Sequence, residues 1–87
     1  MTTINSRVGA IQSADDKSVN FYGYGKYVGD EIPNRGWLQE AQIPNPCIVL
    51  DGGSKVYGFE CWWGAADKVK EMIGDREIIA IQAPTGE

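Results

Sequence analysis

The sequence predicts a small α+β domain in which an antiparallel sheet of about five strands carries one helix. Three observations support this prediction. Strand-like apolar segments recur along the 87 residues, turn sequences separate them, and one segment alone has clear helical spacing. A chain of this length forms one domain, so we expect a single domain over residues 1–87. A strongly curled sheet and a small barrel fit the pattern equally well.

The first two strands are expected to form a hairpin. Residues 7–14 (RVGAIQSA) and 18–28 (SVNFYGYGKYV) read as strands, and Asp15 and Asp16 lie in the turn between them. Strict alternation assigns the second strand one face with Val19, Phe21, Gly23, Gly25 and Tyr27 and another with Asn20, Tyr22, Tyr24, Lys26 and Val28. Two interpretations of its glycines remain open: a bulge or bend in the sheet, or room for a ligand.

A second hairpin is expected after a polar loop. Residues 29–36 (GDEIPNRG) are rich in turn formers, and residues 37–42 are long enough for one helical turn. Residues 47–50 (CIVL) and 55–63 (KVYGFECWW) then flank DGGS, a sequence typical of hairpin turns.

The two adjacent tryptophans of this hairpin are expected to point in opposite directions. Alternation groups Trp63 with Tyr57, Phe59 and Cys61 on the more apolar face, and leaves Trp62 for a surface or an interface. Since tryptophan is enriched at binding hot spots, Trp62 is the strongest single indication of function.

The C-terminal part contains the predicted helix and the last strand. Residues 65–73 (AADKVKEMI) have apolar side chains at helical spacing, and Gly74 stands where a glycine commonly ends a helix. Residues 77–81 (EIIAI) read as the last strand.

Composition excludes several kinds of chemistry. The chain has no histidine and two cysteines, so we expect no catalytic residues, no metal site and no cofactor. Its net charge is −4 and its eight basic residues are scattered, so we expect no direct binding to nucleic acid.

The same sequence favours a cytoplasmic protein that does not enter a membrane. It contains neither an apolar run long enough to span a bilayer nor an apolar N-terminal stretch of the signal-peptide type. In that reducing compartment we expect Cys47 and Cys61 to remain unbridged thiols.

The ingredients of a nucleotide pocket are nonetheless present. Aromatic rings can stack on a base, and lysine or arginine can hold a phosphate. The candidate ligand-binding residues are Tyr22, Tyr24, Lys26, Arg35, Trp37 and Trp62. The alternative for Arg35 is a solvated side chain. It is also a candidate partner for Glu60, together with Lys26 and Arg7, if that carboxylate is partly buried.

The segments GYGKYVGDEIP (23–33), IPNPCIVLDGGSKVYG (43–58) and ECWWG (60–64) resemble those of a family of small uncharacterised bacteriophage and prophage proteins. The resemblance extends from about Val8 to Ile81. It implies a compact accessory protein, in the host cytoplasm if phage-encoded, of a kind that often blocks host defence. Such proteins either sequester a nucleotide signal or bind a defence protein.

Two hypotheses for function follow. The first is a non-enzymatic protein that sequesters a small anionic ligand, such as a nucleotide immune signal. The second is an acidic inhibitor that binds a host defence or nucleic-acid-processing protein. In either case the thin core of a domain this small favours a homo-oligomer, most simply a dimer.

Overall fold

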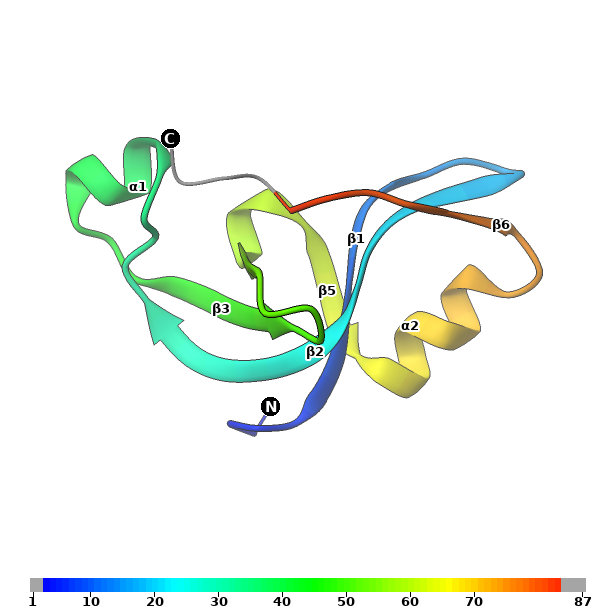
Figure 1. The fold of residues 1–87 in the computed structure, drawn as a ribbon, viewed down its shortest axis with the longest axis horizontal. Helices are drawn as coiled ribbons and strands as arrows, with labels where there is room; N and C mark the ends of the chain where they lie inside the picture. Colours follow the sequence, from blue (N-terminus) through cyan, green and yellow to red (C-terminus); the bar gives the residue numbers. More distant parts are fainter. Residues whose placement is uncertain (1–2, 84–87) are drawn as a thin grey trace.

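The computed structural model describes residues 3–83, which fold into six strands and two α-helices (Figure 1). Their bounds are β1 Arg7–Ala14, β2 Ser18–Glu31, α1 Gly36–Ala41, β3 Asn45–Leu50, β4 Lys55–Tyr57, β5 Trp62–Ala65, α2 Ala66–Ile73 and β6 Glu77–Ala80. The predicted α+β class is confirmed, and α2 coincides with the expected helix. Neither helix within residues 3–83 has the length and apolar character needed to cross a membrane.

The long strand β2 organises the sheet. Strand β1 pairs antiparallel along one of its edges, while β3 and β6 share the other edge. The main order is β4-β3-β2-β1-β5, so the sheet is open and not a closed barrel. Strand β6 runs parallel to β2, which differs from the purely antiparallel sheet expected from the sequence. The helix α2 between β5 and β6 carries the chain back to make this parallel pairing possible.

Strand β2 curves strongly between its two halves (Figure 1). Gly25 is needed on this curve, because a Cβ atom there would lie 2.7 Å from the Cα atom of Leu50 in β3. The space beside Gly25 is therefore filled by the neighbouring strand, and it is not free for a ligand.

A register shift in the β1–β2 hairpin overturns the alternation predicted for β2. Ala10 pairs with Gly23, but the next pair is Ile11 with Phe21, so Tyr22 has no cross-strand partner. Gly23 takes a φ of 132°, a value that favours glycine, so it is the residue that accommodates the bulge. Phe21 and Tyr24 consequently share one side of the sheet, with their ring centroids 4.9 Å apart.

Two apolar clusters lie on the sheet, and Tyr22 and Tyr24 belong to different ones. Tyr22 packs against the cluster of Val8, Ala10, Ile48, Leu50 and Val56. Tyr24 packs against the cluster of Ile11, Val19, Phe21, Val69 and Ile73, which α2 covers. The prediction that alternation places both tyrosines on one face is therefore wrong.

The segment KVYGFECWW is not one continuous strand. A 3-10 turn at Gly58–Glu60 separates β4 from β5, and β5 pairs with β1 instead of continuing along β3. Phe59, which alternation placed in the core, is 40% exposed. The predicted division of the tryptophans nevertheless holds: Trp63 packs on the first cluster and stacks on Tyr27, while Trp62 is 54% exposed.

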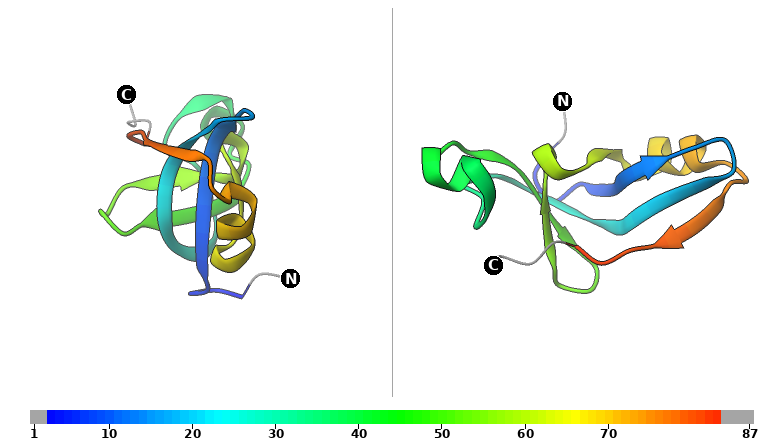
Figure 2. Two further views of the ribbon diagram at one scale, coloured as in Figure 1. Left: turned by 90° about the vertical axis from the view of Figure 1, so that its right-hand side faces the viewer. Right: turned by 90° about the horizontal axis from the view of Figure 1, so that it is seen from above.

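The two helices lie at opposite ends of the molecule along its longest axis (Figure 2). The shorter one, α1, occupies the segment in which one helical turn was predicted, and it buries Leu38. The longer one, α2, lies close to the sheet because Gly9 has no side chain: a Cβ atom there would be 2.8 Å from Val69 Cγ1.

Candidate functional site

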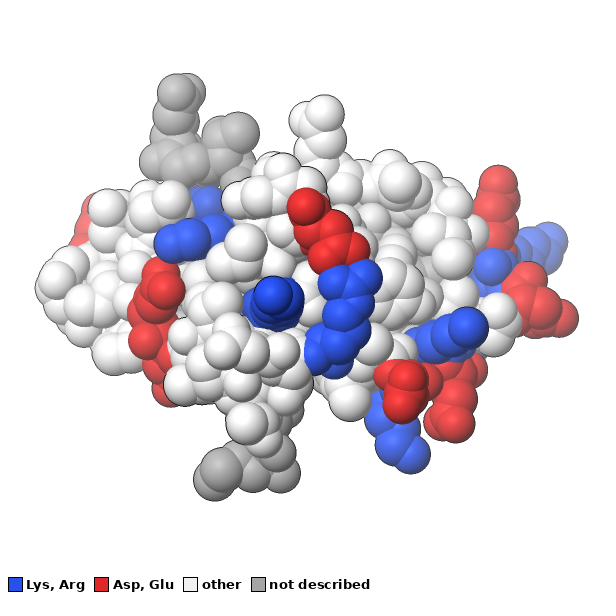
Figure 3. Space-filling model, turned by 60° about the horizontal axis from the view of Figure 1, so that its bottom comes forward, with Lys and Arg blue, Asp and Glu red and all other residues white. Residues whose placement is uncertain are grey.

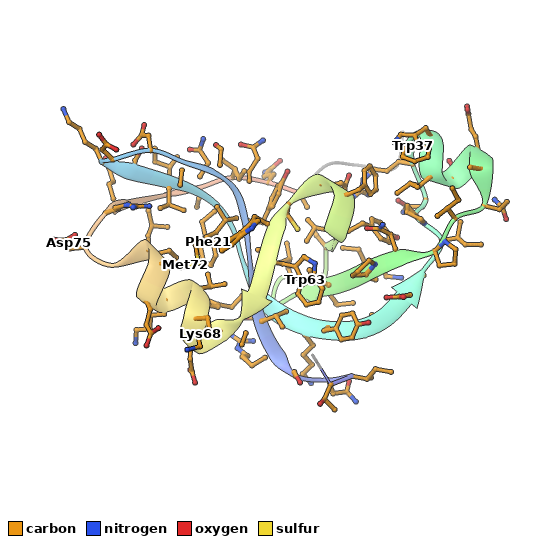
Figure 4. The ribbon with its side chains drawn as sticks, turned by 180° about the vertical axis from the view of Figure 1, so that it is seen from behind. Phe21, Trp37, Trp63, Lys68, Met72 and Asp75 are labelled. Atoms are coloured by element: carbon orange, nitrogen blue, oxygen red, sulfur yellow. The ribbon has the colours of Figure 1, made fainter. Side chains whose placement is uncertain are left out.

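The six predicted ligand-binding residues do not converge on one pocket. Trp37 is 64% exposed on α1, far from the α2 end that carries Met72 and Asp75 (Figure 4). Tyr22 lines a separate hollow of about 420 Å³ together with Leu50. The remaining four divide among three places: an ion pair, a hollow beside α2 and a groove beside β5.

Arg35 lies in an ion pair beneath the 3-10 turn. Its Nε and Nη2 atoms donate to the two carboxylate oxygens of Glu60 at 2.6 and 2.7 Å, and both side chains are about nine-tenths buried. Nη1 donates to Asn34, and Nη2 also donates to the carbonyl of Lys55. The hydrogen bond from Arg35 to Glu60, more than any other contact, raises the pKa of the guanidinium.

Glu60 connects this ion pair to the backbone, since its Oε1 accepts the N–H of Tyr57 at 3.0 Å. The Arg35 guanidinium also lies over the Tyr57 ring, 5.2 Å from its centroid. Of the partners considered for Glu60, Arg35 is therefore the one that the fold supplies. Each guanidinium nitrogen donates within the protein, so this arginine holds the 3-10 turn and is not free for a phosphate.

The hollow beside α2, which we call the Tyr24 hollow, has a volume of about 280 Å³ and is lined by Arg7, Tyr24, Ala66, Asp67 and Lys70. The Arg7 guanidinium lies 5.7 Å from the centre of the Tyr24 ring. Lys26, another predicted site residue, is exposed and pairs in register with Arg7. Lys and Arg side chains gather across the middle of this face, with carboxylates among them (Figure 3).

Arg7 already holds a carboxylate at this hollow. Its Nη1 and Nη2 atoms donate to the two oxygens of Asp51 at 2.5 and 2.6 Å. That hydrogen bonding lowers the pKa of Asp51 and raises the pKa of Arg7. The pair is exposed to solvent, so water and dissolved anions compete for both partners.

The groove beside β5, which we call the Trp62 groove, has a volume of about 200 Å³ and a mostly apolar lining. Ile11 and Val19 are buried residues of the α2-side cluster that reach the groove. Trp62 and Met72 line it as exposed side chains, and Arg76 adds a positive charge. An apolar hollow with an exposed tryptophan is typical of a site that accepts an apolar side chain.

Sequence reasoning missed most of the residues that line the Tyr24 hollow and the Trp62 groove. Met72 belongs to the apolar stripe of the helix, yet it lies at the edge of that stripe and is 44% exposed. Arg7, Lys70 and Arg76 are isolated basic residues, and no local pattern connects them. A map of strand neighbours would have found Arg7, because it is paired with Lys26 in the hairpin.

The cysteines are free thiols, as predicted. Burial raises the pKa of the Cys61 thiol to about 12, and burial is also the main cause that raises the pKa of Cys47. Both are protonated at neutral pH and poor nucleophiles. Within residues 3–83, no group of three or more potential ligands is placed to hold a metal ion.

Comparisons of the chain with protein-family models, with curated proteins and with solved structures find no match.

Proposed function

We propose that this chain is a non-enzymatic binding protein that recognises another protein through the Trp62 groove. The observation that carries the proposal is the exposed Trp62 ring beside an apolar groove whose buried residues belong to the core. A tryptophan in such a position leaves a large apolar surface in water, and a protein partner would remove that cost.

The rest of the surface supports the same proposal. Nine large apolar side chains are at least 40% exposed among the described residues, and two of them, Trp62 and Met72, lie together in the Trp62 groove. The six residues expected to form a nucleotide pocket are dispersed, which weakens the hypothesis of a stacked nucleotide. The proposal keeps the second hypothesis from the sequence, binding to another protein through an acidic surface and an exposed sheet edge or aromatic patch, and assigns the aromatic contact to the Trp62 groove.

The proposal is tested by affinity capture with a matched pair of variants. Trp62→Ser and Trp37→Ser each remove one exposed ring, from opposite ends of the molecule. The wild type and Trp37→Ser should retain the same protein from an extract of cells that naturally express the chain. Trp62→Ser should lose it while its melting temperature stays close to that of the wild type. Equal retention by all three proteins would overturn the proposal.

A second candidate function is the binding of a small anion at the Tyr24 hollow. It is supported by the arrangement of Arg7 over Tyr24, with Lys70 also lining the hollow and Lys26 paired with Arg7 in the hairpin. Three cations there face two carboxylates, Asp51 and Asp67, so the local charge is opposite in sign to that of the whole chain. A nucleotide signal of host defence, and the phage context itself, remain predictions from the resemblance.

The predicted homo-oligomer also remains a prediction. Exposed apolar residues such as Ile32 and Ile43 could pack against a second copy. Light scattering at high micromolar concentration should give a mass above the 9.5 kDa of one chain. A mass of one chain at that concentration would contradict the prediction.

A further inference from the structure

We infer that the occupant of the Trp62 groove is an extended segment of the partner protein, which adds a strand to the free edge of β1. The segment carries a large apolar side chain and, beside it, lysine or arginine. This inference rests on the proposed function and specifies the shape and chemistry of the partner.

The neighbouring strands β1 and β5 have unequal lengths. Strand β1 has eight residues, but β5 pairs with only four of them, and the pairing stops at Ile11, opposite Trp62, the first residue of β5. Beyond that point no strand within residues 3–83 pairs with this edge of Gln12–Ala14, and these three residues are exposed. Strand edges with unpaired N–H and C=O groups are templates for another extended chain.

The Trp62 groove lies beside this unpaired part of β1. Gln12, Ser13 and Ala14 line it directly, together with the Trp62 ring and Met72. A segment that continues the path of β5 along β1 would therefore pass over an apolar hollow. Alternate side chains of a strand point the same way, so one of them would enter between Trp62 and Met72.

Acidic residues lie close to the end of this edge. The hairpin turn that follows Ala14 contains Asp15 and Asp16, and Asp75 in the loop after α2 is followed by Glu77, the first residue of β6. The Glu77 N–H donates to the carbonyl of Lys17 at 2.9 Å, so the two acidic segments lie side by side. Four carboxylates there exceed the two positive charges of Lys17 and Arg76, and both signs are visible at the α2 end of the molecule (Figure 3).

The backbone N–H groups of Lys17 and Ser18 donate to Asp15 and lower its pKa, which stabilises its charged form. An acidic rim favours a basic segment. It also disfavours a second copy of this chain, whose net charge is −4 and whose own β1 edge ends in the same acidic turn.

The inference is tested by panning a random library of twelve-residue peptides on the immobilised protein. We expect the enriched peptides to share a large apolar residue with Lys or Arg nearby. Their affinity should fall at least tenfold for Trp62→Ser and for Met72→Glu, and it should be unchanged for Trp37→Ser. Methylation of alternate peptide amides in one phase should abolish binding, while methylation in the other phase should not, because only one set of N–H groups faces β1.

Three results would overturn the inference: no enriched sequence, an acidic consensus, or equal tolerance of both methylation phases. If peptide binding disappeared as the protein self-associates, the inference would be overturned, and the occupant of the groove would be a second copy of this chain. Failure here is distinguishable from failure of the proposed function. If partner capture still depends on Trp62 while no peptide binds, the groove recognises a folded surface and only the extended segment is wrong.

Discussion

Two arginines hold carboxylates in the same forked geometry but in opposite surroundings. Arg35 holds Glu60 where both side chains are about nine-tenths buried, whereas Arg7 holds Asp51 where both are more than half exposed. The donor–acceptor distances are nearly equal, so geometry does not distinguish the pairs. Solvent does: a buried charge that loses its partner is costly, while an exposed one is rehydrated. The first pair therefore maintains the fold, and the second is free to exchange partners.

The largest expected effect comes from breaking the buried pair. Glu60→Gln should lower the free energy of unfolding by about 3–5 kcal/mol, because it leaves the Arg35 charge buried and uncompensated. Urea unfolding measures this loss. Glu31→Gln is the matched control, since the Lys55–Glu31 pair is exposed, and its midpoint should move little. Equal midpoints for both variants would show that the burial of Glu60 has no energetic consequence.

A smaller effect is expected when the charge is kept and the fork is removed. Arg35→Lys leaves one cation beside Glu60, but an ammonium cannot also reach Asn34 and the Lys55 carbonyl while lying over Tyr57. The loss should be about 1–3 kcal/mol, in the range of hydrogen bonds to charged groups. Arg7→Lys, compared in the same urea titration, should leave the midpoint unchanged. If Arg35→Lys also left it unchanged, charge alone would explain the buried pair.

The difference between the pairs shows what sequence reasoning reached and what it missed. Opposite charge made Arg35 a candidate for Glu60, together with Lys26 and Arg7, but no local pattern chose among them. The choice depends on the 3-10 turn at Gly58–Glu60, which bends the chain so that Glu60 reaches Arg35. That turn is held by long-range contacts, so the apolar segment around it reads as an ordinary strand.

The contrast between local patterns and long-range contacts also explains which other features were predicted correctly. The first hairpin, its turn at Asp15 and the helix α2 follow from local patterns, which are short-range effects. The bulge at Gly23 depends on the opposite strand β1, and it separated Tyr22 from Tyr24. The exposure of Trp62 was predictable, because adjacent side chains of a strand point to opposite faces and Trp63 takes the more apolar one. The groove itself was not, because Met72 comes from another element.

The stability that the exposed Arg7–Asp51 pair contributes should depend on pH. Arg7 lowers the pKa of Asp51 in the folded chain, so this pair contributes stability above the ordinary aspartate pKa of about 4. The contribution is lost as the pH falls through the lowered folded value. Asp51→Asn removes it, so the variant and the wild type should differ slightly at neutral pH and converge in strong acid. Thermal melts across that range measure the difference.

The control for this pH effect is Asp15, whose pKa is lowered mainly by the backbone N–H groups of Lys17 and Ser18, with Arg76 as the smallest contribution. Asp15→Asn should show the same convergence in acid. Added salt should reduce the neutral-pH difference for Asp51→Asn, because ions screen an exposed pair, and should reduce it less for Asp15→Asn. A difference for Asp51→Asn that grows as the pH falls would contradict the assigned direction of its pKa shift.

The smallest effect expected is anion exchange at Arg7. Inorganic pyrophosphate added to the protein should shift the NMR signals of the Arg7 side chain and the Tyr24 ring, because an anion competes with Asp51 for the same donors. The Arg35 signals should not move, since Glu60 holds that guanidinium away from solvent. Asp51→Asn should raise the affinity by about twofold to fivefold, in keeping with the small value of an exposed pair, and Arg7→Gln should abolish the shifts. High salt should weaken them. Equal shifts of the Arg35 and Arg7 signals would show that solvent exposure does not determine which pair exchanges partners. That result would also contradict the proposal of an anion site at the Tyr24 hollow.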